Sequence, residues 1–288
     1  MKPTVEMVLR QNLKALKLST MFSRLEEHVR QASEAHQSYE EFLLGLTDIE
    51  LQVRADNRLK RRLKEARFPL MKPLDTFQFE KAVGLDARQI RQLCTGEYIR
   101  QSHNVIFLGK SGTGKTHLAT GLGIEACKEG FRTRFVTGCG LVNELVEAQE
   151  ERVLNRLLKR YASYDLLILD ELGYVPFSKI GAELLFQVLA ERHERKSVII
   201  TTNLGFADWT QIFGEANLTA ALLDRLTHRA SILTCSWSSY RLQDTLEQSV
   251  GKAKKRKPDA QRSPVKANAS ESSEARKHNA DSKTEDFG

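Results

Sequence analysis

The stretch NVIFLGKSGTGKTHLATGLG, residues 104–123, decides the fold. Its apolar run 105–108 predicts a buried strand, and the glycine-rich run 109–116 leads from that strand into a predicted helix. This is the G-x-x-x-x-G-K-[ST] pattern in a strand–loop–helix setting. Its glycines let successive backbone N–H groups point inward at the start of a helix, which makes a nest for anions. The pattern predicts a nucleotide site; the alternative is an ordinary glycine-rich turn.

Each part of this loop has an expected role toward the phosphates. We expect Lys115 to reach the β- and γ-phosphates and the hydroxyl of Thr116 to ligate Mg²⁺. The residues expected to bind the nucleotide are Gly109, Lys110, Ser111, Gly112, Thr113, Gly114, Lys115 and Thr116.

A second apolar run ends in two acids. In the stretch 164–171, four apolar residues precede Asp170 and Glu171, which predicts a buried parallel strand with carboxylates at its carboxyl end. Open α/β sheets bind ligands at that edge. We expect Asp170 to hold Mg²⁺ through water, and Glu171 to orient and deprotonate the attacking water. Paired acids after a strand are also common in surface turns. The upstream loop favours the catalytic interpretation, and the second acid favours hydrolysis over binding alone.

Two further polar residues complete the predicted site. The strand expected at 197–203 ends in Asn203, which can hydrogen-bond the γ-phosphate or the water, although Thr and Asn are also ordinary cap residues. The helix expected around 222–229 carries Arg225, which suits an arginine finger that reaches the nucleotide of a neighbouring subunit. Arg229 is the competing candidate.

Residues from about 4 to 67 predict a helical N-terminal region. Ser38 begins its second helix with a capping box, and a third helix is expected from Thr47 to Arg67, before two prolines. Further along, Gly138-Cys139-Gly140 is expected to break the chain ahead of the next helices.

The last N-terminal helix is densely cationic over residues 54–67. A row of cations on one helical face can lie along a phosphate backbone and gain affinity by counterion release. The alternative is a solvated helix face; the neighbouring nucleotide motif favours nucleic acid. The expected DNA contacts are Arg54, Arg58, Arg61, Arg62 and Lys64.

The whole chain fits a cytoplasmic protein. Its 288 residues carry a net charge of +7, which suits a polyanionic partner. The four cysteines form no C-x-x-C pair, as expected of reduced thiols. No apolar run is long enough to span a bilayer, and the N-terminus lacks a signal peptide's apolar region, so no membrane partner is expected.

Alternating strands and helices with these motifs describe an AAA+ ATPase core, an α/β fold with a parallel sheet flanked by helices. Further strands are expected at 132–136 and 230–235. The expected organisation is a helical DNA- or partner-binding domain, a linker, the ATPase domain and a disordered basic tail. Their bounds are 1–68, 69–85, 86–248 and 249–288.

The sequence resembles a narrower family, the IstB-like helper ATPases of IS21-type transposons, which are relatives of the bacterial helicase loader DnaC. The resemblance covers residues from about 10 to 245. The motifs that carry it are LKLSTM (16–21), NRLKRRLKEARFP (57–69), FLGKSGTGKTHLA (107–119), DLLILDELGYVPF (165–177), SVIITTNLGFADW (197–209), LTAALLDRLTHRASIL (218–233) and SYR (239–241).

The resemblance implies an ATP-bound homo-oligomer, a ring or spiral, that assembles on double-stranded DNA. It would help select the target site and would recruit and stimulate an IstA-like transposase. By this resemblance, Lys115 and Thr116 take the Walker A positions, and Asp170 and Glu171 take the Walker B positions. Asn203 takes the sensor 1 position, Arg225 that of the arginine finger, and Arg241 that of a sensor 2 arginine. The alternatives are a DnaC-like replicative helicase loader, which its bound partner would distinguish, and a nucleotide-bound scaffold without a catalytic role.

Overall fold

A five-stranded sheet forms the centre of the computed structural model, which describes residues 4–239 of the chain. The strand order is β2-β3-β4-β1-β5, and every neighbouring pair is parallel. The strands are β1 (Asn104–Gly109), β2 (Thr133–Thr137), β3 (Leu166–Asp170), β4 (Ser197–Thr202) and β5 (Ala230–Cys235). Parallel strands need crossover helices, and those helices bury both faces of the sheet. The predicted α/β class is confirmed.

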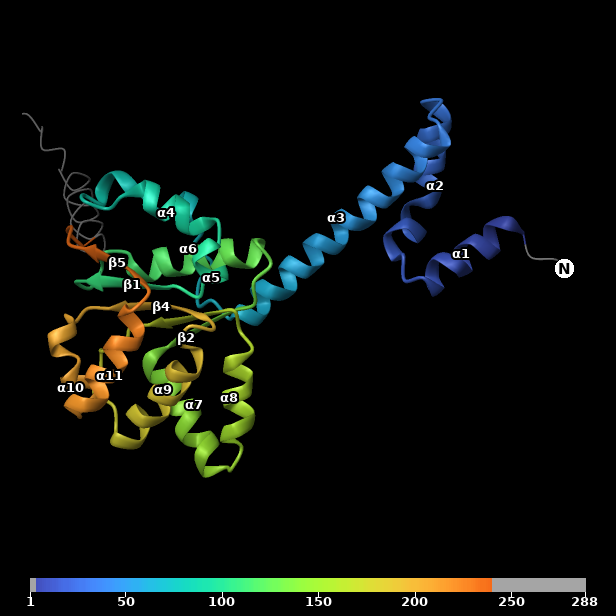
Figure 1. The fold of residues 1–288 in the computed structure, drawn as a ribbon. Helices are drawn as coiled ribbons and strands as arrows, with labels where there is room; N and C mark the ends of the chain where they lie inside the picture. Colours follow the sequence, from blue (N-terminus) through green and yellow to red (C-terminus); the bar gives the residue numbers. More distant parts are fainter. Residues whose placement is uncertain (1–3, 240–288) are drawn as a thin grey trace, which may run out of the picture. The chain divides into compact units, whose positions relative to one another are not determined.

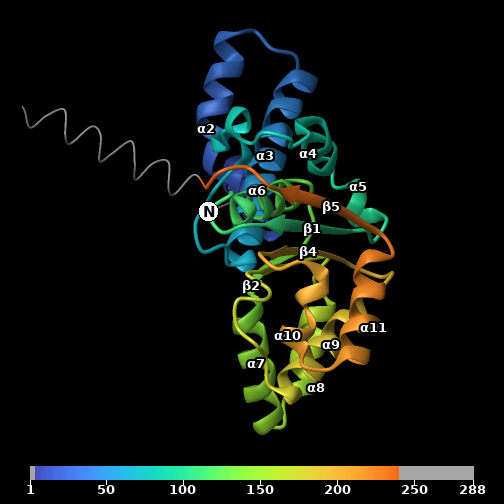
Figure 2. The same cartoon turned by 90° about the vertical axis from the view of Figure 1, so that its left-hand side faces the viewer.

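Helices cover the two faces in separate groups (Figures 1 and 2). One face carries α4 (Ala87–Cys94), α5 (Glu97–Arg100) and α6 (Lys115–Lys128). The other carries α7 (Gly138–Glu150), α8 (Leu154–Ala162), α9 (Lys179–Arg192), α10 (Thr210–Phe213) and α11 (Ala216–Thr227). The short 3₁₀ turns are η1 (Leu74–Thr76), η2 (Phe79–Lys81) and η3 (Phe206–Asp208).

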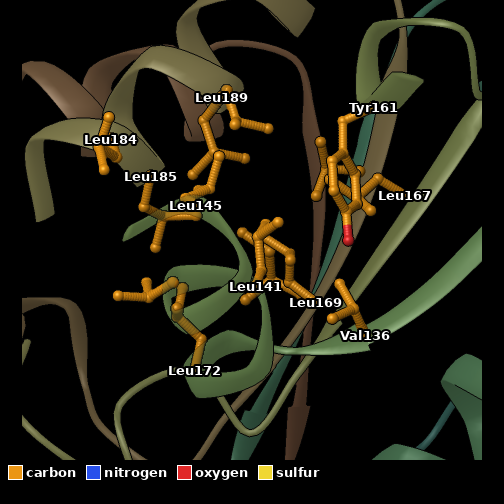
Figure 3. Packing of buried hydrophobic residues seen from close by; sticks show 14 of the residues in the cluster. Val136, Leu141, Leu145, Tyr161, Leu167, Leu169, Leu172, Leu184, Leu185 and Leu189 are labelled. Carbon is orange, nitrogen blue, oxygen red and sulfur yellow. The ribbon is translucent and has the colours of Figure 1, made fainter. Parts of the chain in front are cut away.

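The core on the α7 side holds the acid-bearing strand in place (Figure 3). Leu167 and Leu169 of β3 are fully buried against Leu141 and Leu145 of α7 and Leu185 of α9. Truncating one buried leucine to alanine typically costs about 2–5 kcal/mol. The position of the acids at the end of β3 is therefore fixed by a well-filled apolar layer.

The N-terminal region forms three helices with boundaries that differ from the prediction. The predicted capping box at Ser38 is confirmed, but the helix that it starts, α3 (Tyr39–Ala66), continues without a break. The expected start at Thr47 is wrong because its hydroxyl donates to the carbonyls of Leu43 and Leu44 within the helix instead of capping a new one. The break lies earlier, at Lys17 with φ 57°, between α1 (Val5–Ala15) and α2 (Ser19–Glu34).

A buried carboxylate joins α2 to α3. Glu50 of α3 accepts hydrogen bonds from the backbone N–H groups of Thr20 and Met21 at 2.8 and 3.0 Å. This replaces the side-chain cap that α2 lacks. Arg54 donates to Glu50 at 2.7 Å and to the carbonyl of Lys17 at 2.5 Å. Burial alone would raise the pKa of Glu50; the Arg54 guanidinium and the two amides outweigh burial, so the pKa lies below its ordinary value.

The expected break at Gly138-Cys139-Gly140 is also wrong, because these residues form the first turn of α7. The helix is capped by the last residue of β2, Thr137, whose hydroxyl oxygen accepts a hydrogen bond from the N–H of Gly140 at 3.1 Å. A Cβ at Gly138 would lie 3.0 Å from a methyl of Leu172. Glycine here permits a tight strand-to-helix turn beside the acid-bearing loop.

Candidate functional site

The glycine-rich loop between β1 and α6 is shaped by close contacts with the end of the sheet. A Cβ at Gly109 would lie 2.1 Å from the carbonyl oxygen of Cys235 in β5, so only glycine fits there. Gly112 and Gly114 have φ of 81° and 89°, the left-handed conformation that glycine adopts without strain. The indole N–H of Trp237 donates to the carbonyl of Thr113 at 3.0 Å and holds the loop from outside. The loop is therefore preformed.

Lys115 begins α6 and lies folded back over the loop. Its ammonium group donates to the carbonyls of Gly109 and Lys110 at 2.6 and 2.8 Å, and the residue is only 9% exposed. A desolvated ammonium held by carbonyl oxygens can transfer its donors to phosphate oxygens placed in the same loop. The role of Lys115 toward the phosphates stays a prediction.

Three residues from three elements meet at the carboxyl edge of the sheet. Asp170 Oδ1 accepts hydrogen bonds from the hydroxyls of Thr116 at 3.0 Å and Thr201 at 2.5 Å. Burial raises the pKa of Asp170, with Glu171 acting in the same direction, while the hydroxyl groups and Lys115 oppose the rise. The sequence prediction missed Thr201. What could have found Thr201 is the parallel pairing of β3 with β4. In that pairing Leu169 lies opposite Ile200, so the next residues, Asp170 and Thr201, are neighbours.

Glu171 turns away from the strand that precedes it. Its φ of 55° is a left-handed conformation, and its N–H donates to the hydroxyl oxygen of Thr201 at 2.9 Å. The side chain is exposed and lines the cavity beside the loop, as does Asn203 at the end of β4. The two adjacent acids therefore have different environments: Asp170 is buried among hydroxyls and Glu171 faces the cavity.

The cavity beside the loop has a volume of about 320 Å³. One wall comes from the segment between α3 and α4, which lies within the predicted linker. His117 of α6 fixes this wall: its Nε2 lies 3.0 Å from the Pro73 carbonyl and 3.2 Å from the Thr76 hydroxyl, and its ring meets that of buried Phe77 edge to face. The lining residues are Lys72, Thr76, Phe77, Gln78, Ser111, Gly112, Gly114, Lys115, Thr116, His117, Glu171, Tyr174, Thr201, Thr202 and Asn203.

The donor set fits Mg²⁺. The Thr116 hydroxyl and the Asp170 carboxylate lie side by side at the end of the phosphate loop, and hydroxyl and carboxylate oxygens are the ligands that Mg²⁺ prefers beside nucleotide phosphates. These two residues would hold the ion, which when bound neutralises charge on the phosphate oxygens.

Comparison with known proteins shows the family of the chain. The family described as "IstB-like ATP binding protein" matches residues 11–248, which is most of the chain. The chain belongs to the IstB-like ATP-binding protein family. The relatives include the "Insertion sequence IS232 putative ATP-binding protein" of Bacillus thuringiensis subsp. berliner, 38% identical over 81% of this chain and 93% of its own. The "Insertion sequence IS21 putative ATP-binding protein" of Pseudomonas aeruginosa is 38% identical over 81% of this chain and 88% of its own.

One solved structure supports the AAA+ fold, and a second shows a similarity only. The AMPPCP-bound DnaA of Aquifex aeolicus matches with a TM-score of 0.50 at 20% identity, over 64% of this chain and 56% of its own. The crystal structure of the DnaC helicase loader matches with a TM-score of 0.46 at 26% identity, over 57% of this chain and 96% of its own. Within residues 4–239 of this IstB-like protein, no helix has the length and apolarity needed to cross a membrane.

The two candidate finger arginines of this IstB-like protein lie apart from its own cavity. Arg225 of α11 stacks its guanidinium over the ring of Phe186, 4.7 Å from the ring centroid, and is half-buried. Its Nη1 has no hydrogen-bond partner among the described residues. Arg229 is exposed just after α11. Arg241, the sensor 2 candidate, and the predicted basic tail 249–288 lie outside the described residues.

The five predicted DNA-binding residues all lie on α3 but in different surroundings. Arg58 and Lys64 are exposed, and Arg61 is exposed beside Glu65, with 4.0 Å between nitrogen and oxygen. Arg62 is half-buried. Arg54 is engaged with Glu50 and the Lys17 carbonyl, so part of its hydrogen-bonding capacity already holds the helices together.

Proposed function

We propose that this protein is an ATPase that binds double-stranded DNA and assists transposition, by helping to select the target site and by recruiting and stimulating an IstA-like transposase. The observation that carries the proposal is made at the phosphate loop: Asp170 accepts hydrogen bonds from the hydroxyls of Thr116 and Thr201. The Thr201 hydroxyl also accepts one from the N–H of Glu171. Relatives described as ATP-binding proteins of insertion sequences support the biological setting.

In the proposed reaction, ATP places its phosphates in the loop and Lys115 exchanges its carbonyl partners for phosphate oxygens. Glu171 faces the cavity and acts as the general base toward water, and Asn203 helps to orient that water. Asp170 stays with Thr116, and these two residues would hold Mg²⁺. The site separates the metal-holding acid from the water-activating acid.

We infer an oligomer from the set of residues that line the cavity. Among the described residues, no arginine lines it, although phosphoryl transfer is strongly accelerated by an arginine that stabilises the charge on the transferred group. We assign this role to Arg225 of a neighbouring subunit, with Arg229 as the alternative. A ring or spiral supplies one such arginine to each cavity.

The DNA-binding surface is assigned to α3. Arg58, Arg61 and Lys64 present exposed cations along its second half, where phosphate contacts would release counterions. Changing Arg58 and Arg61 together to glutamine should weaken DNA binding. The slope of the logarithm of the binding constant against the logarithm of the salt concentration should become shallower by about two units, one for each lost charge. ATP binding should be unchanged, because it is assigned to the glycine-rich loop and not to α3.

The test of the function measures ATP hydrolysis by the full-length protein across a titration of duplex DNA. Hydrolysis should rise with DNA, and Glu171→Gln should abolish hydrolysis while ATP and DNA binding persist. Glu191→Gln, which changes an exposed acid on α9, is the matched control and should behave as wild type. A flat response of the wild type to DNA would reject DNA stimulation, and hydrolysis by Glu171→Gln would reject the assigned base.

A mixing experiment tests the trans assignment. Arg225→Ala subunits retain their own Glu171, and Glu171→Gln subunits retain Arg225. Mixing the two inactive variants should restore part of the hydrolysis, because some cavities then combine both intact residues. The transposition role is tested by adding the partner transposase and target DNA: strand transfer should depend on ATP and on Lys115.

A further inference from the structure

A cluster of two histidines and a glutamate lies where α9 and α11 end. His193 caps the carboxyl end of α9, Glu194 follows it, and His228 caps the carboxyl end of α11. One ligand atom from each of the three lies within 4.8 Å of the others. None of these residues lines the nucleotide cavity, so the cluster is separate from the proposed ATPase site.

The core fixes the distance between the two helix ends. Leu189 of α9 and Leu222 and Leu226 of α11 belong to one buried apolar cluster. Beyond this core, Nδ1 of His228 lies 3.7 Å from the Glu194 carboxylate, and the two imidazole rings are 6.0 Å apart, centre to centre. The three side chains therefore converge because of how the two helices pack.

The orientation of His193 presents a free lone pair. Its Nδ1 lies 3.1 Å from the backbone carbonyl oxygen of Arg225. Because a carbonyl can only accept, Nδ1 carries the proton and donates, which leaves Nε2 of the neutral ring as a metal-ligating atom. Metal-binding histidines typically hold their second nitrogen in this way, on a carbonyl or carboxylate.

We infer that His193, Glu194 and His228 form a binding site for a divalent transition metal of the zinc type. Two imidazoles and one carboxylate are donors that suit Zn²⁺ or Co²⁺, whereas Mg²⁺ and Ca²⁺ prefer oxygen ligands throughout. Three protein ligands leave coordination positions for water. Since His228 and Glu194 are about half exposed, at 55% and 49%, the site is open to exchange with solvent.

Two nearby cations, Lys196 and Arg192, are committed to other partners. The Lys196 ammonium is paired with the Asp165 carboxylate at 2.5 Å. Arg192 is buried and donates to four backbone carbonyls, those of Tyr161, Tyr164, Asp165 and Ser197. Glu194 brings a negative charge to the metal. A bound ion would join the ends of α9 and α11 and so restrain the helix that carries Arg225.

The test is a Zn²⁺ titration of the full chain, free of any polyhistidine tag, against a chromophoric chelator. We expect one Zn²⁺ per chain, and a loss of affinity of about tenfold or more in each of His193→Asn, His228→Asn and Glu194→Gln. Two matched controls should bind Zn²⁺ as wild type does: His36→Asn, at an exposed histidine after α2, and Glu191→Gln, one turn before the site.

Two further measurements identify the ligands. Co²⁺ should give visible d–d bands without a cobalt–thiolate band, because no cysteine belongs to the site. Zn²⁺ should raise the melting temperature of wild type and leave that of His193→Asn/His228→Asn unchanged, which also checks that the double variant folds. Unaltered Zn²⁺ affinity in the double variant, a thiolate band, or binding only at millimolar Zn²⁺ would each overturn the site. None of these readouts depends on ATP hydrolysis.

Discussion

Replacing Thr201 with valine should uncouple the two acids at the end of β3, Asp170 and Glu171. The Thr201 hydroxyl donates to the Asp170 carboxylate at 2.5 Å and accepts from the N–H of Glu171 at 2.9 Å. Valine keeps the branched shape but removes both bonds. Asp170 then keeps the Thr116 hydroxyl, and the Glu171 amide loses its partner.

The size of the effect follows from the two bonds. A hydrogen bond to an ionised carboxylate contributes about 1.5–3 kcal/mol, and a stranded buried amide costs about 1–3 kcal/mol. Because the site borders a cavity that admits water, we expect about 3 kcal/mol of lost stability in total. For a chain of this size that lowers the melting temperature by about 6–12 °C. The rate of ATP hydrolysis should fall about tenfold or more, with a smaller change in ATP affinity.

The assay compares thermal unfolding and ATP hydrolysis in three variants of the full chain. Thr201→Ser keeps the hydroxyl and should retain most activity. Thr219→Val is the matched control, because Thr219 is also buried, and among residues 4–239 its hydroxyl donates only to the carbonyl of Glu215, the N-cap of its own helix. It should cost about 1 kcal/mol and leave hydrolysis unchanged. If Thr201→Val unfolded like Thr219→Val and hydrolysed ATP like wild type, the coupling argument would be refuted.

Three further changes test other parts of the structure. Glu50→Gln should speed amide hydrogen exchange in the first turn of α2 at neutral pH. Since the folded-state pKa of Glu50 is lowered, the slower exchange of the wild type should be fully present above the ordinary pKa of 4.5 and should be lost as pH falls through the lowered pKa. His117→Ala should weaken ATP binding about tenfold by freeing the cavity wall at Thr76, measured by calorimetry, and an unchanged Kd would contradict that role. Glu171→Asn should abolish hydrolysis with no loss in melting temperature, because asparagine tolerates the left-handed backbone of Glu171. A large drop in melting temperature would argue against backbone strain at Glu171.

The sequence predicted the strands well because each is a short apolar run with polar residues at its end. The predicted strand 230–235 coincides with β5, and Asp170 ends β3 as expected. Sequence also located Lys115 and Thr116, since the loop motif is local. Residue Thr201 was missed because its role depends on the register between β3 and β4, which no local pattern contains.

Errors in the helical boundaries have a common physical origin. Helix ends depend on which groups satisfy the free backbone N–H and C=O groups, and several side chains can do so. At Thr47 the hydroxyl bonds backward within α3, whereas Thr137 bonds forward and starts α7 at a glycine. At α2 the cap comes from Glu50, a residue far along the chain. Long-range capping of this kind has no signature in the sequence near the helix.

The different roles proposed for Asp170 and Glu171 follow from one backbone change. A strand that continued past Asp170 would send the next side chain to the opposite face of the sheet. Instead, Glu171 adopts φ 55°, a conformation that costs a non-glycine residue about 1 kcal/mol or more. The Thr201 hydroxyl holds this turn by accepting the Glu171 N–H while donating to Asp170. Backbone strain persists only where the surroundings enforce it, and here the enforcing group also binds the other acid. The strain therefore places a carboxylate in the cavity next to a buried one, which is the arrangement on which the proposed hydrolysis depends.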